Sequence, residues 1–139
     1  GHPHMPSAVI KLPDEPIVIV TIALPIERHL SSLYSVWAQI DRIARQVRRP
    51  LYTILDLRGQ DLSFSDILLG LDEQKDQPPG SMTDPRVRPI VAGDHPLLAI
   101  AQKKARQQLA IEIPVFDTLQ IALAYVRAEL EGQANHSSR

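Results

Sequence analysis

Hydrophobic residues in this chain occur both as continuous runs and as stripes with helical spacing. The runs at residues 17–23, 51–57 and 88–92 are dominated by apolar and β-branched residues and show no regular polar alternation. Strands of this kind are buried on both faces, as in a parallel sheet covered by helices on both sides. The pattern therefore predicts three central strands of one sheet.

Two further strands are predicted at the ends of this sheet. Residues 8–12 precede a turn at residues 13–16, in which two prolines flank two acidic residues, so the chain opens with a β-hairpin. A last strand is expected at residues 111–116, where Pro114 has no N–H for a ladder and favours a sheet edge. Either edge leaves open the possibility of a homodimer.

Helical stripes fill the intervals between the predicted strands. Apolar residues recur at three- and four-residue steps at residues 27–47, 63–72, 96–109 and 119–131. The resulting order is β-β-α-β-α-β-α-β-α, which is typical of an α/β domain with a mostly parallel sheet.

The remaining segments set the expected domain boundaries. Residues 1–5 look like a tag remnant followed by a start methionine, and residues 132–139 are small and polar enough to predict a disordered tail. Residues 74–88 are rich in proline without periodicity, which favours a mobile loop. A single domain over residues 6–131 is therefore expected.

Composition narrows the class of protein. The chain has 139 residues, of which 44% are apolar, enough for one full core. Its 15 basic and 16 acidic residues give a net charge of -1, which argues against nucleic acid as a partner. No run approaches the roughly 20 apolar residues of a membrane span, and no signal-peptide pattern is present. The absence of cysteine fits a reducing compartment, so we expect a cytoplasmic protein.

Three segments resemble the STAS superfamily, and in particular its SpoIIAA-like branch. They are the strand at residues 53–57 before a short helix, the strand and turn at residues 90–94, and the ending at residues 115–127. The resemblance implies a STAS fold and a non-enzymatic regulatory module that binds a protein partner. Some members are switched by phosphorylation of a Ser or Thr at the start of the short helix, and others bind nucleotides or lipid-like ligands.

The candidate modification sites are Ser63 and Ser65. They lie at a predicted helix N-terminus, where free N–H groups and the positive end of the helix dipole favour a phosphate. The alternative is that Ser63 only caps the helix, because Ser63 and Asp66 have the spacing of a capping box.

The candidate binding residues lie at this helix and at strand ends, where open α/β sheets bind their ligands. They are Asp56, Arg58, Phe64, Asp66, Asp94 and His95. Asp56 is expected to cap its loop or to pair with Arg58. Asp94 or His95 is expected to cap the next helix, and an apolar or anionic ligand would lie near Phe64, Asp94 and His95.

The common enzyme motifs are missing from the chain. It contains no GxxxxGK[ST], GxGxxG, GxSxG or HExxH, and its histidines have no metal-ligand spacing. We therefore expect no catalysis, no cofactor and no metal. The first functional hypothesis is a regulatory module that binds an unknown protein, and the alternative is a carrier or sensor of a small ligand.

Overall fold

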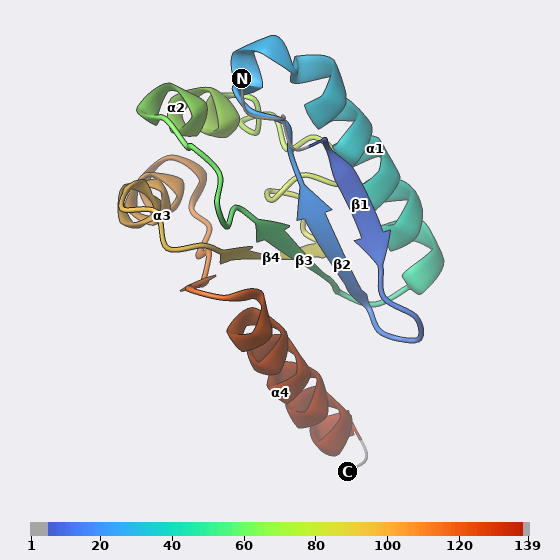
Figure 1. The fold of residues 1–139 in the computed structure, drawn as a ribbon. Coiled ribbons are helices and arrows are strands. Elements are labelled where there is room, and N and C mark those ends of the chain that lie inside the picture. Colours follow the sequence, from blue (N-terminus) through green and yellow to red (C-terminus); the bar gives the residue numbers. More distant parts are fainter. Residues whose placement is uncertain (1–5, 138–139) are drawn as a thin grey trace.

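The chain forms an α/β domain around one mixed sheet (Figure 1). The computed structural model describes residues 6–137, so the expected tag remnant lies outside the described residues, as do residues 138–139. The strands are β1 (Ala8–Lys11), β2 (Ile17–Thr21), β3 (Leu51–Asp56), β4 (Val87–Ala92) and β5 (Val115–Phe116). They follow the order β1-β2-β3-β4-β5, in which β1 is antiparallel to β2 and all other neighbours are parallel.

The opening hairpin and the two edges agree with the sequence pattern. β1 and β5 are the outer strands, and Pro114 immediately precedes β5. The last strand is shorter than predicted, because only two residues of the segment 111–116 pair with β4.

The helices follow the predicted order with shifted ends. They are α1 (Leu30–Val47), α2 (Phe64–Asp72), α3 (Leu97–Leu109) and α4 (Leu119–Ser137). A short 3-10 helix, η1 (Ile26–Arg28), precedes α1, so the single helix predicted from residue 27 is divided at His29. α4 continues past its predicted end at residue 131, into the segment that composition alone marked as a tail.

The helices are divided unequally between the two faces of the sheet. Consecutive parallel strands joined by right-handed crossovers place α1, α2 and α3 on one side. The core on that side includes Val18, Trp37 and Leu98, whereas Ile54 and Val126 belong to a separate core on the other side. Among the described elements, α4 covers this second side, where it contacts β3, β4 and β5 (Figure 1).

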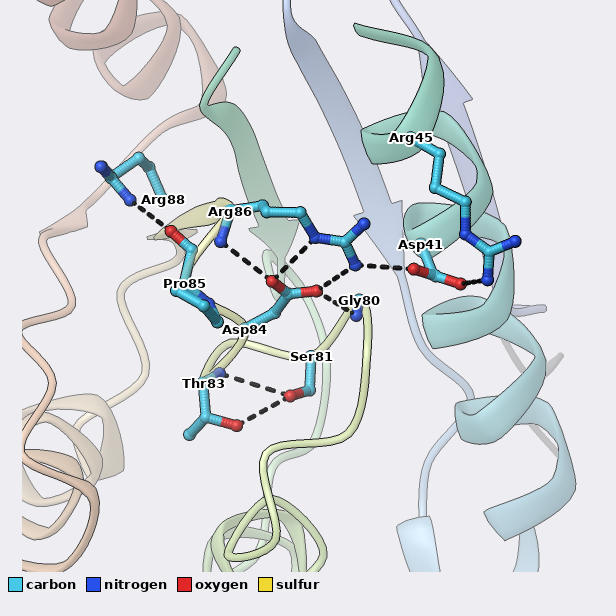
Figure 2. Close-up of polar contacts among 9 residues, drawn as sticks. All are labelled: Asp41, Arg45, Gly80, Ser81, Thr83, Asp84, Pro85, Arg86 and Arg88. Atoms are coloured by element: carbon cyan, nitrogen blue, oxygen red, sulfur yellow. Dashed lines mark hydrogen bonds and ion pairs between the residues drawn. The ribbon is translucent and has the colours of Figure 1, made fainter. Parts of the chain in front are cut away.

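The segment between α2 and β4 is irregular but packed, whereas the sequence favoured a mobile loop. Asp84 is 4% exposed, and its carboxylate accepts hydrogen bonds from the N–H groups of Gly80 (2.7 Å) and Arg86 (2.9 Å). The Arg86 guanidinium bridges Asp84 and Asp41 of α1, at 2.6 Å from each (Figure 2). We call Asp41, Gly80, Asp84 and Arg86 the Asp84 cluster, and it fastens the segment to α1.

Hydrogen bonding dominates the electrostatics of this cluster. Burial by itself raises the pKa of the Asp84 carboxyl, but the hydrogen bonds from Arg86 and Gly80 outweigh burial and lower this pKa to about 2. A hydrogen bond from Arg86 is the largest cause of the lowered pKa of Asp41, and a hydrogen bond from Arg45 lowers it further. Both carboxylates are therefore ionised at neutral pH and hold Arg86 between them.

Candidate functional site

The start of α2 is stabilised by the capping box that its sequence predicts. The Ser63 hydroxyl accepts a hydrogen bond from the Asp66 N–H at 3.1 Å, and Asp66 Oδ2 accepts one from the Ser63 N–H at 2.9 Å. The other oxygen of Asp66 accepts a hydrogen bond from the Ile26 N–H at 3.0 Å. Asp66 is 4% exposed, so this carboxylate is a buried link between α2 and η1.

We expect Asp66→Ala to destabilise the fold by about 2–3 kcal/mol, because it leaves two N–H groups without their charged acceptor. Ser63→Ala is the matched variant, since it removes one neutral cap and should cost about 1 kcal/mol. Urea unfolding of both variants measures the difference. Equal losses would contradict the structural link to Ile26.

Apolar side chains are exposed on the outer faces of α2 and α3. Phe64 and Leu68 lie one turn apart on α2 and are 46% and 42% exposed. On α3, Ile100 is 41% exposed, and Lys104 one turn later places its ammonium 5.7 Å from the centre of the Phe64 ring. We call the surface of Phe64, Ser65, Leu68, Ile100 and Lys104 the α2–α3 face.

The two candidate serines differ in their surroundings. The Ser63 hydroxyl takes part in the capping box, as the alternative of a purely capping role expects. Ser65 is exposed and lines an open groove together with Leu68 of α2 and Gln108 of α3. Of the two, Ser65 is the one that lines this groove.

Asp56 pairs with Arg58 at the end of β3, as the sequence predicts. The two guanidinium bonds measure 2.8 Å each, and the Arg58 N–H also donates to Asp56 at 3.2 Å. The side-chain hydrogen bond from Arg58 is the main cause of the lowered pKa of Asp56. This acid is therefore held as a carboxylate that stabilises its own turn.

At the neighbouring end of β4, the N-cap of α3 is Pro96, whereas the sequence favoured Asp94 or His95. The Nδ1 atom of His95, one residue before the cap, accepts a hydrogen bond from the Leu97 N–H at 3.1 Å. Asp94 is exposed to solvent. The ends of β3 and β4 lie side by side, since the Leu57 N–H donates to the Ala92 carbonyl.

The predicted residues thus form separate groups. Within residues 6–137, no hydrogen bond or ion pair joins the Asp56–Arg58 pair to Asp94 or His95, and none joins these residues to the start of α2. Their acceptor atoms are largely used in local structure. The exposed apolar surface of α2 and α3 is the feature without an evident structural use.

Sequence reasoning missed two features of the structure. One is the Asp84 cluster, although its Asp84-Pro85-Arg86 spacing repeats that of Asp56-Leu57-Arg58 with the same bidentate pairing. The other is an apolar cavity of about 110 Å³ between the sheet, α2 and α3. No motif could have signalled the cavity, because it depends on how side-chain volumes add up.

The described residues contain neither a metal-binding cluster nor a membrane-spanning helix. Among them, no group of three or more His, Asp or Glu side chains could hold a metal ion. In the same part of the chain, no helix combines the length and apolar character needed to cross a bilayer.

Comparisons with protein-family models, with curated proteins and with solved structures found no match for this chain. Its own geometry is therefore the basis for the function proposed below.

Proposed function

We propose that this chain is a STAS-like, non-enzymatic regulatory module that binds a protein partner through the α2–α3 face. The single observation behind the proposal is the exposure of Phe64, Leu68 and Ile100 on two helices that contact each other. Contiguous exposed apolar side chains with a polar rim are typical of protein-interaction surfaces.

The rim supports the same interpretation. Lys104 lies over the Phe64 ring, and Asp72 and Lys75 line the groove beside Leu68. An aromatic ring near the centre, surrounded by charged groups that meet solvent, is a common arrangement of an interface anchor. The partner surface that fits this face is apolar at its centre and acidic where it meets Lys104.

A binding role also agrees with how the other polar candidates are used. The Asp56 carboxylate accepts hydrogen bonds from Arg58, the Asp66 carboxylate accepts them from backbone N–H groups, and His95 accepts one from the first N–H of α3. Each of these side chains has a structural task that accounts for its residue type. This supports a non-enzymatic module in which the helices, and not the strand ends, meet the partner.

The proposal is tested by capture from a lysate of the source organism with the immobilised chain, followed by mass spectrometry. Phe64→Ala combined with Ile100→Ala should reduce retention of the captured partner at least tenfold, because truncated anchors each cost more than about 1 kcal/mol. Ile121→Ala is the matched control, since Ile121 is 50% exposed but lies on α4. Equal capture by all three proteins would refute the proposal.

A second arm of this experiment tests a phosphorylation switch. Ser65→Glu places negative charge on the α2–α3 face without touching the cap, and it should weaken capture of the same partner. Ser63→Asp changes the capping box itself, so its effect is compared with the unfolding free energy of that variant. Unchanged capture by Ser65→Glu would remove the switch from the proposed function and leave the binding face.

A further inference from the structure

An apolar cavity lies beneath α2 and is lined mainly by core residues. It has a volume of about 110 Å³ and lies between the sheet and the inner faces of α2 and α3. Its walls include Leu55 and Val91 from the sheet, Ile67 and Leu71 from α2, and Leu98 and Ala101 from α3. Side chains from the sheet and from two helices therefore line one hydrophobic space.

Two polar residues border the cavity, and both form hydrogen bonds to neighbouring backbone groups. The Asp66 carboxylate accepts from the Ile26 N–H, and the Gln102 amide donates to the Ile113 carbonyl at 2.7 Å. The surface of the lining is almost wholly apolar. Apolar cavities of this kind stay dry and bind apolar molecules; an engineered cavity of about 150 Å³ lined by aliphatic and aromatic side chains binds benzene or xenon.

A smaller apolar cavity of about 50 Å³ lies on the same side of the sheet, against α1. Its walls include Trp37 and Ile40, and Met82 lines both cavities. The Met82 backbone is held by a hydrogen bond from its N–H to the Gln74 side chain at 2.8 Å. Methionine side chains are unbranched and adapt to irregular spaces by changing rotamer. Met82 lies between the two cavities, as do Ile22 and Leu55.

A glycine lets η1 approach α2 closely at one wall of the larger cavity. Gly70 lines the cavity, although glycine in the interior of a helix costs stability relative to alanine. A Cβ atom at this position would lie 3.3 Å from the Ile26 Cδ1 atom, which is a crowded contact. The absence of a side chain at Gly70 therefore accommodates Ile26, which also lines the cavity.

We propose that the larger cavity binds a small, uncharged apolar molecule of about the size of a benzene ring. Movement of the Met82 side chain extends the site toward the smaller cavity, so that a ring with a short alkyl chain also fits. Phe64, Asp94 and His95, which the sequence suggested for a ligand, do not line this cavity. The site is independent of the α2–α3 face and is tested without a protein partner.

The test is a titration of the full chain with benzene, followed by methyl-selective NMR. The methyl signals of Ile67, Leu71 and Met82 should shift together and saturate. Ala101→Leu, which directs three more carbon atoms into the cavity, should weaken benzene binding at least tenfold. Ala128→Leu adds the same atoms on exposed α4 and should leave the affinity unchanged. If Ala101→Leu does not fold, Ala101→Val, which adds two carbon atoms at the same position, takes its place as the filled variant.

The role of Met82 is tested with n-propylbenzene as the probe. Met82→Ala should raise the affinity for this longer molecule at least fivefold relative to the unchanged chain, while benzene affinity changes less. No saturable methyl shift with benzene would overturn the proposal, as would equal affinity in the filled variant. Equal effects of Met82→Ala on both probes would show that the two cavities do not join.

Discussion

Replacing Gly80 by alanine is expected to destabilise this protein by about 4 kcal/mol, which is a large effect for one added methyl group. A Cβ atom at Gly80 would lie 2.0 Å from the Trp37 carbonyl oxygen and 2.9 Å from the Asp41 N–H nitrogen. Both are backbone atoms of α1, which cannot move aside as a flexible side chain can. The positive φ of 85° at Gly80 adds a conformational cost for any L-residue.

Gly59→Ala separates these two contributions. Gly59 also has a positive φ, of 70°, but no atom lies within 4 Å of a Cβ built there. This variant should therefore lose only about 1 kcal/mol of unfolding free energy, measured by urea denaturation, from backbone conformation alone. If both variants lost the same amount, Gly80 could not approach α1 as closely as described.

Asp84→Asn is expected to remove about 2 kcal/mol of stability at neutral pH and to flatten the acid limb of the stability curve. The folded pKa of Asp84 is about 2, below the ordinary value of 3.8. A carboxyl with a lowered folded pKa stabilises the protein above its unfolded pKa. That contribution is lost as the pH falls from about 4 to about 2, and a shift of this size corresponds to about 2 kcal/mol.

Unfolding free energies at pH 7, 4, 3 and 2 measure this effect. The unchanged chain should lose stability more steeply than Asp84→Asn over the last two steps. Asp72→Asn is the control, because the Asp72–Lys75 ion pair lies at a solvent-exposed site, where such pairs contribute little to stability. A variant curve parallel to that of the unchanged chain would contradict the proposed role of Asp84.

The parts of the fold that were predictable depend on contacts between residues close in sequence. The hairpin, the helical stripes and the capping box of Ser63 and Asp66 all act within a few residues, so their patterns are visible along the chain. The Asp56–Arg58 pair is equally local. The segment before β4 was mispredicted because its key contact, from Arg86 to Asp41, spans 45 residues.

The candidate site was predicted less well than the fold, for a related reason. Sequence reasoning selected polar residues at strand ends and at the start of α2, and most of these have structural tasks that share the same residue types. Which apolar side chains stay exposed depends on how α2 and α3 pack together. Phe64 was selected from the sequence, whereas Leu68 and Ile100 were recognised only once the two helices were placed.

The order of the strands has a consequence for synthesis of the chain on the ribosome. Each strand pairs with the strand that precedes it in sequence, so every new strand finds its partner already made as the chain emerges. The three helices on the shared side can dock in the same sequence. The opposite side, which includes Ile17 and Ile54, is covered only when α4 leaves the exit tunnel. Burial of that side is therefore the last step of a vectorial assembly, and the nascent chain is most exposed to self-association just before it.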